Sequence, residues 1–203
     1  MKSIEIDARF VRAAQAAQAH NDVRYYLNGF CFLPDGRIAA TNGHVLYVAT
    51  YADDKADRVE HPIIVNVLGK VPTSAKLCTF IFQDDQSGFC KTDNARAYCF
   101  EVIDGKFPDI DRVLSPLKRL GEPKALSDGW SANANYLALL PKIFGAGSLV
   151  TCCHGTEHEP VVLQGSPYLR KGDPGDLFFS TSMVVLMPVR VGREFYRAGE
   201  EAA

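Results

Sequence analysis

The densest group of potential metal ligands in the sequence is the run Cys152-Cys153-His154, followed by His158. A tetrahedral zinc site needs about four nitrogen or sulfur ligands, usually as two pairs well separated in sequence. Neighbouring residues on a strand point to opposite faces of a sheet, so only one of the two cysteines could readily join the histidines. We therefore interpret the run as a strand followed by a polar turn, and we predict no metal and no other cofactor.

Two groups of carboxylates could perform acid–base chemistry or hold Mg²⁺, namely Asp53, Asp54 and Asp57, and the pair Asp84 and Asp85. Each group lies in a predicted turn without a flanking base or a phosphate-binding glycine loop, which indicates solvated turn acids. The sequence also contains no Walker A loop, GxGxxG, GxSxG or HExxH motif. We predict no catalytic residue and no enzymatic activity. An enzymatic alternative stays open, and it would depend on the Cys/His run at 152–158.

The composition is that of a soluble globular protein. The 203 residues are 47% hydrophobic and 23% charged, which allows one or two domains. A formal net charge of −2 argues against a general nucleic-acid-coating protein, although positive groups gathered on one face could still bind DNA. There is no signal peptide or membrane-length apolar run, and the six cysteines are expected to be reduced, so we predict a cytoplasmic protein without membrane contact.

The elements expected to position these residues are helices and antiparallel strands. Asp7 is a good cap for a helix over 7–20, and Pro34-Asp35-Gly36 is typical of a hairpin turn. A second helix over 133–140 should stop or kink at Pro141. Strand-like runs cover 23–33, 37–40, 44–51, 61–71 (running into a short helix before Pro72), 77–82, 88–91, 95–103, 149–153 and 160–164, and an apolar run covers 177–191. Because the strands are adjacent and hairpin-connected, the fold class is predicted to be α+β.

Three separated segments carry a specific resemblance. Residues 19–29 read AHNDVRYYLNG and lead to ATNGHVL at 40–46, residues 104–114 read DGKFPDIDRVL, and residues 184–191 read VVLMPVRV. In the same order they are similar to HxDVRYYLNG with ATDGHRL, to DGRFPDYRRVLP and to VVMPMRL of the bacterial beta sliding clamp family, the beta subunit of DNA polymerase III. One such string would be a weak signal, but three in register are specific.

The resemblance implies the DNA-clamp fold, with helices packed on antiparallel sheets, in a shortened form. Members of the family carry three similar domains, each built from two helix-plus-sheet halves. Here residues 1–114 resemble the middle domain, and residues 128–191 resemble the second half of the last domain. Residues 115–127 form a predicted linker, and 192–203 form a tail that extends past the usual C-terminus.

Clamps of this family form rings around duplex DNA, and a topological link with loose positive charge retains DNA without reading its sequence. The resemblance therefore implies a DNA replication processivity factor that assembles as a homo-oligomer. If each chain keeps three of the twelve half-domains of a family ring, four chains would close it. The candidate DNA-facing residues are Lys2, Arg9, Arg12, Asn21, Arg24, Tyr26, Lys70, Lys76 and Lys142.

The family also implies a pocket in which a short hydrophobic peptide from each partner docks, the partners being DNA polymerase and other proteins with a clamp-binding motif. The matching positions are Thr41, Gly43, His44, Leu46, Pro108, Arg112, Val113, Val185, Met187, Pro188, Val189 and Arg190. Val45 stands where the family has arginine, which removes a positive group from the rim of the pocket. The tail 192–203 could cover the same pocket.

A second function from a different class stays open. The chain could be a clamp-like protein-interaction module, derived from a phage or mobile element, that binds clamp partners or a host clamp without encircling DNA. The thin positive helix faces and the net charge of −2 favour this alternative more than they would for a full-length clamp.

Overall fold

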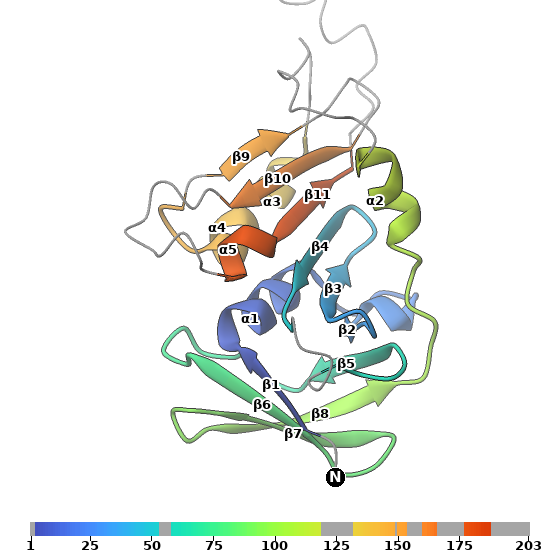
Figure 1. Ribbon diagram of the computed structural model, residues 1–203, viewed down its shortest axis with the longest axis vertical. Helices are drawn as coiled ribbons and strands as arrows, with labels where there is room; N and C mark the ends of the chain where they lie inside the picture. The colour runs from blue at the N-terminus through green and yellow to red at the C-terminus, as the bar shows by residue number, and fades with distance from the viewer. Residues whose placement is uncertain are drawn as a thin grey trace, which may run out of the picture.

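The computed structural model describes residues 3–52, 58–118, 132–148, 150–153, 160–165 and 177–187. These residues form one 11-stranded sheet with the strand order β1-β6-β7-β8-β5-β2-β3-β4-β11-β10-β9. Each of the strand pairings is antiparallel. Short helices lie beside the sheet, so the predicted α+β class is confirmed (Figure 1).

The first unit contains one long helix and eight strands. Its elements are β1 (Ser3–Asp7), α1 (Ala8–Ala17), the 3₁₀ turn η1 (Tyr25–Leu27), β2 (Phe30–Phe32), β3 (Arg37–Thr41), β4 (Val45–Thr50), β5 (Ile63–Val67), β6 (Leu77–Phe82), β7 (Ser87–Thr92), β8 (Ala97–Ile103) and then α2 (Asp111–Lys118). Asp7 caps α1 as predicted, because its Oδ1 accepts the backbone N–H of Arg9 at 2.8 Å. Gly36 has a φ of +83° in the predicted turn between β2 and β3, a conformation that favours glycine.

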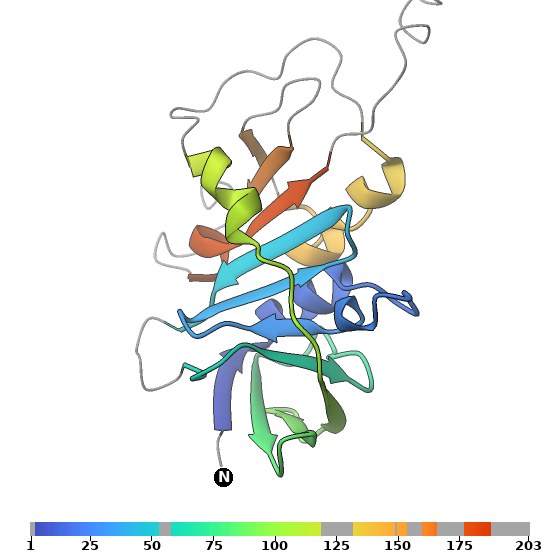
Figure 2. The same ribbon diagram turned by 90° about the vertical axis from the view of Figure 1, so that its right-hand side faces the viewer.

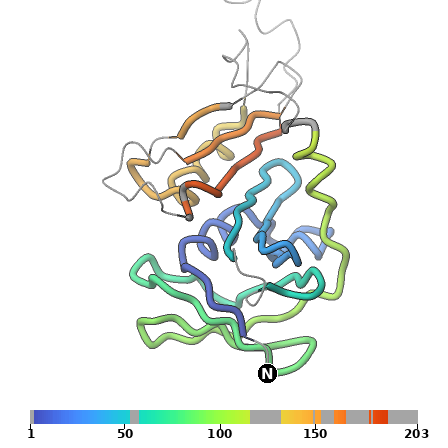
Figure 3. The backbone as a smooth tube through the Cα atoms, viewed as in Figure 1, coloured from blue at the N-terminus to red at the C-terminus, as the bar shows by residue number. Residues whose placement is uncertain are grey.

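The second unit adds three strands to the same sheet. Its elements are α3 (Ala134–Leu137), α4 (Leu140–Phe144), β9 (Val150–Cys153), β10 (Val161–Gly165), α5 (Leu177–Thr181) and β11 (Met183–Leu186). β11 pairs with β4, so the sheet continues from one unit into the other, and α4 packs beside α1 (Figure 3).

A hydrophobic core lies on each face of the sheet. The larger core includes the buried side chains of Phe10, Phe30, Phe32 and Phe80, and α1 lies flat against the sheet through Ala13, Ala14 and Ala17. On the opposite face, the segment 104–118, which we call the outer strap, leaves β8 and crosses the sheet to α2 (Figure 2). Its buried side chains Phe107, Ile110 and Leu114 complete the second core.

The predicted short helix after β5 is wrong. Among residues 68–76 there is no helix, and Gly69 has a φ of +149°. Side chains of α1 hold this loop instead: Arg12 Nη1 donates to the carbonyls of Pro72 and Ala75 at 2.9 Å each, and Gln15 bonds the backbone of Gly69 and Val71. The loop backbone thus finds its polar partners on α1 rather than within a helix of its own.

Other expected bounds also differ from the structure. The predicted strand 23–33 shrinks to β2, because residues 25–27 form η1. The predicted helix 133–140 is two short helices, with Pro141 in the first turn of α4, where its missing N–H costs nothing. Residues 115–118, placed in the linker, are the end of α2, whereas 119–127 and the tail 192–203 lie outside the described residues.

Candidate partner-binding pocket and basic groove

A cavity of about 200 Å³ opens on the outer face where the β3–β4 hairpin, the outer strap and the end of β11 meet. We call it the outer pocket. Its floor is apolar and its rim carries a few polar groups, which is the usual make-up of a site for apolar peptide side chains. It is lined by Arg24, Tyr26, Leu27, Thr41, Gly43, His44, Val45, Leu46, Pro108, Asp109, Ile110, Val113 and Met187.

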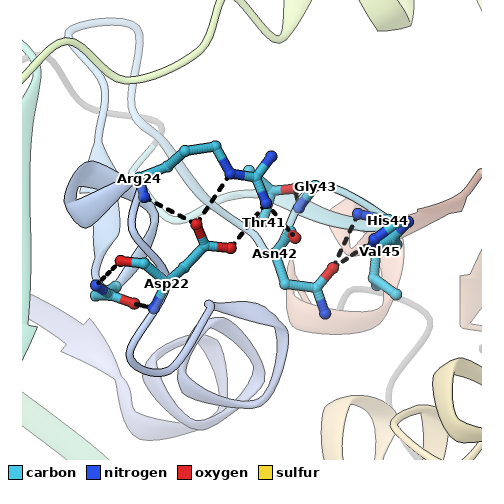
Figure 4. A network of polar contacts seen from close by, with 8 residues as sticks. Asp22, Arg24, Thr41, Asn42, Gly43, His44 and Val45 are labelled. Carbon is cyan, nitrogen blue, oxygen red and sulfur yellow. Dashed lines mark hydrogen bonds and ion pairs between the residues drawn. The ribbon is translucent and has the colours of Figure 1, made fainter.

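The hairpin that forms one wall of the outer pocket is fixed by its own side chains. Asn42 Oδ1 accepts the backbone N–H groups of both His44 and Val45 at 2.9 Å, and Thr41 Oγ1 accepts the N–H of Gly43 at 3.0 Å (Figure 4). Gly43 has a φ of +89°, and a Cβ at this position would lie 2.8 Å from Arg24 Nη1. The backbone conformation therefore favours glycine here, and the guanidinium of Arg24 would have to move to admit a Cβ.

Arg24 supplies a positive charge at the rim of the outer pocket. Its guanidinium bonds Asp22 through Nε at 3.0 Å and Nη2 at 2.7 Å, and Nη2 also approaches the carbonyl of Asn42 at 3.4 Å (Figure 4). The hydrogen bond from Arg24 lowers the pKa of Asp22 to about 2. Val45 is fully buried and packs in the larger core. Arg24, paired with Asp22, is therefore the cation at this rim.

The second unit contributes Met187 to the lining of the outer pocket. The backbone N–H of Met187 donates to the carbonyl of His44 at 2.9 Å, and Val185 lies opposite Leu46 in the β4–β11 ladder. The ring of His44 stacks on Tyr136 of α3 at 5.2 Å between centroids and 15° between planes. Among the described residues, the first unit thus supplies most of the lining, and the second unit adds Met187 and contacts the hairpin wall.

The outer pocket gathers most of the predicted residues that the structure describes. Val185 lies buried beneath the pocket, and Arg112 is exposed on α2 outside the lining. Pro188, Val189 and Arg190 lie outside the described residues. The predicted residues that line it are Thr41, Gly43, His44, Leu46, Pro108, Val113 and Met187.

Sequence reasoning missed several pocket residues. Leu27 and Ile110 line the pocket, and Arg24 and Tyr26 line it too although they were predicted to face DNA. All four lie inside the motif runs 19–29 and 104–114, so these motifs were the sequence signal that could have identified them as pocket residues. Tyr136 had no such signal, because its contact with His44 joins residues of different units.

A larger groove of about 1050 Å³ lies on the helical side of the molecule. It runs between α1, the loop after β5 and α4, and we call it the basic groove. No acidic residue of the described chain lines it, whereas His20 and four of the predicted DNA-facing residues do, namely Arg9, Arg12, Lys70 and Lys142. Asn21, Arg24, Tyr26 and Lys76 do not line it, and Lys2 lies outside the described residues.

The two arginines of the basic groove are engaged within the protein. Arg9 pairs with Asp7 at 2.6 Å and lies over the ring of Phe178 at 5.0 Å. Arg12 holds two loop carbonyls, and its burial lowers the pKa of its guanidinium. Lys70 and Lys142 are exposed. These two lysines are the groove cations best placed to meet a ligand.

Nothing in the described part of the chain resembles a metal centre, since no three His, Cys, Asp or Glu residues gather there. Cys152 and Cys153 lie on β9 as predicted, whereas His154 and His158 are outside the described residues. Contact with Cys78 and burial raise the pKa of Cys90, so this thiol stays protonated. Among the helices described, none has the length and apolar character to cross a membrane.

The fold is that of the DNA sliding clamps. The DNA polymerase III beta subunit of Pseudomonas aeruginosa matches 94% of this chain and 67% of its own, with a TM-score of 0.58 and 17% identity. The beta subunit of Borrelia burgdorferi, solved with a natural product, matches 95% of this chain and 65% of its own, with a TM-score of 0.59 and 16% identity.

The sequence is similar to the beta sliding clamp in particular. The Escherichia coli (strain K12) protein is 34% identical over 120 residues, which cover 52% of this chain and 31% of the relative. The chain thus matches less than a third of the length of this relative. No family model matches the sequence. The predicted resemblance, a shortened version of the beta sliding clamp, is confirmed.

Proposed function

We propose that this chain is a sliding-clamp-like processivity factor of DNA replication. It encircles duplex DNA as a homo-oligomer in the cytoplasm and tethers DNA polymerase and repair proteins through the outer pocket. The observation that carries this proposal is the outer pocket itself, because residues from three motifs far apart in the sequence meet there at the join of the two units. The similarity to beta sliding clamps supports it.

Retention on DNA would come from positive groups that contact phosphates without reading bases. The basic groove supports this role through Lys70 and Lys142, which are exposed. A ring needs several copies of this shortened chain, and four would supply as many half-domains as a full-length clamp ring.

The test is topological. The protein is loaded onto nicked circular DNA, with a clamp loader if it needs one, and the DNA is then linearised. A sliding ring stays on the circle and leaves the linear ends, and its solution mass exceeds that of a monomer. Lys70→Glu and Lys142→Glu should each shorten retention, whereas Lys106→Glu on the outer strap, a matched charge change, should not. Retention that ignores DNA topology, or a monomer at all concentrations, would count against the ring.

A second candidate is a protein-interaction module that binds clamp partners, or a host clamp, without encircling DNA. The observation that favours it is the internal engagement of Arg9 and Arg12, which leaves few free cations in the basic groove. Peptide binding at the outer pocket without topological retention on DNA would select this candidate.

A further inference from the structure

The outer strap forms one wall of the outer pocket. Pro108, Asp109, Ile110 and Val113 of the strap line the same cavity as Thr41 and residues 43–46 of the hairpin. The position of the strap on the sheet therefore sets the width of the pocket.

The strap is anchored to the sheet mainly by apolar side chains. Phe107, Ile110 and Leu114 are 7%, 5% and 3% exposed, and they pack on the second core. Two backbone hydrogen bonds stay within the strap, from the N–H groups of Val113 and Leu114 at the start of α2 to the carbonyl of Ile110. Apolar contact is not directional, so it restricts the orientation of the strap on the sheet less than a hydrogen bond or an ion pair does.

Arg37 adds a directional tie between the sheet and the strap. At the start of β3, its Nη1 and Nη2 bond the two carboxylate oxygens of Asp111 at 2.9 Å each. Asp35 bonds the same guanidinium at 2.6 Å, which fixes its orientation. The Arg37 side chain is only 19% exposed. A two-point pair of this kind restricts both distance and angle, which a single contact does not.

The tie acts at a distance from the cavity. Thr41 lies four residues beyond Arg37 on β3, about 13 Å away at roughly 3.3 Å per residue. Asp111, however, directly follows Ile110 of the pocket wall and opens α2, which carries Val113. Any movement of Asp111 away from Arg37 is passed to that wall.

We propose that Arg37 and Asp111 are positioning residues of the outer pocket: their two-point pair holds the outer strap at the width that a bound peptide requires. This inference rests on the proposed peptide-binding function. The partner it concerns is a short peptide with adjacent large apolar side chains, for which a cavity of about 200 Å³ has room.

The experiment has two readouts, and the first needs no peptide. Hydrogen exchange at residues 107–114 is measured on the free full-length protein, wild type and Asp111→Asn. Binding of a fluorescein-labelled heptapeptide with two adjacent leucines is then measured by anisotropy, against the same peptide with alanines in their place. Asp111→Glu keeps the carboxylate, and Glu101→Gln is a matched charge change at an exposed site on β8.

We expect Asp111→Asn and Arg37→Met each to weaken peptide binding about threefold to fivefold, the range that the loss of a partly exposed ion pair gives. The double variant should lose no more than either single one. Hydrogen exchange at residues 107–114 should become faster by a similar factor in Asp111→Asn. Both the exchange rate and the peptide affinity of Asp111→Glu should lie within about twofold of wild type, and those of Glu101→Gln should be unchanged.

Two results would overturn the inference. One is faster exchange in Asp111→Asn with unchanged affinity for the leucine peptide, which would mean that the pair stabilises the strap locally without affecting the pocket. The other is no change in either readout. If the wild-type protein binds neither leucine nor alanine peptide while the exchange still responds, the proposed peptide function fails and the inference falls with it, although the tie itself stands.

Discussion

Arg12 was predicted to face DNA, but its contacts in the structure hold the loop 68–76. Substitutions at Arg12 can distinguish this structural role from DNA binding. In Arg12→Ala, the carbonyls of Pro72 and Ala75 lose the guanidinium that holds them at 2.9 Å. The loop 68–76 then keeps the contacts of Gln15 and, at its far end, the bond from the N–H of Ala8 to the carbonyl of Lys76 at 2.9 Å. The loop should detach from α1 and exchange its amide hydrogens faster.

The size of the effect follows from those two bonds. A hydrogen bond to a charged group contributes about 1.5–3 kcal/mol, and the freed carbonyls can regain water through the basic groove that the Arg12 side chain lines. The lower end of that range applies to each bond, so we expect a loss of about 3 kcal/mol in the free energy of unfolding for both bonds together. With a slope of about 2 kcal/mol per molar urea, the unfolding midpoint should fall by about 1.5 M.

The assay pairs urea unfolding with DNA retention for Arg12→Ala, Arg12→Lys and Lys142→Ala. Lysine keeps the charge, but its side chain is shorter and its ammonium has to reach the position from which Nη1 of Arg12 holds both carbonyls at 2.9 Å. Arg12→Lys should therefore lose part of the stability and keep DNA retention. Lys142→Ala should leave the unfolding midpoint unchanged and reduce retention on DNA. An unchanged midpoint in Arg12→Ala, with retention reduced as in Lys142→Ala, would refute the reasoning and make Arg12 a DNA ligand.

Three further expectations concern other contacts. Gly43→Ala places a Cβ 2.8 Å from Arg24 Nη1 at a φ of +89°, and should cost about 1–3 kcal/mol in unfolding free energy and weaken peptide binding, as urea unfolding and anisotropy would show. Tyr47→Phe removes the buried contact of its hydroxyl with Ser182 Oγ at 3.1 Å, and should cost about 1 kcal/mol by urea unfolding; no change would mean that Ser182 finds another partner. The hydrogen bond from Arg24 lowers the pKa of Asp22 to about 2. The contribution of this pair to the free energy of unfolding is therefore present above the ordinary pKa of aspartate and is lost as the pH falls through about 2. An NMR titration of the Asp22 carboxyl with a midpoint near 4 would contradict this.

Local signals in the sequence predicted the elements that depend on local physics. The cap at Asp7 and the turn at Gly36 need only neighbouring residues, and both formed as expected. The α+β class followed from the order of strands and turns. The motif runs predicted which residues would meet in the outer pocket, because the resemblance carries information about distant contacts that composition and periodicity lack.

The features that sequence reasoning missed depend on contacts across the chain. Residues 68–72 are not helical because Gln15 and Arg12, more than fifty positions earlier, hold their backbone. The second half of α2, residues 115–118, forms where a linker was expected, and the first residue of α2, Asp111, is held by Arg37, 74 positions away. The stack of His44 on Tyr136 is of the same kind. No local pattern encodes such partners.

The pairing of β4 with β11 has a mechanical consequence. The ladder of strand pairs continues across the join, where Val45–Val48 pair with Leu186–Met183. We therefore expect the two units to move as one rigid body and not as two domains joined by a hinge. A force that pulls the units apart must break a row of backbone hydrogen bonds together with the packing of α1 against α4. Bending within one chain is therefore costly. In the ring proposed above, opening to admit DNA would therefore occur at the contacts between chains and not within one chain.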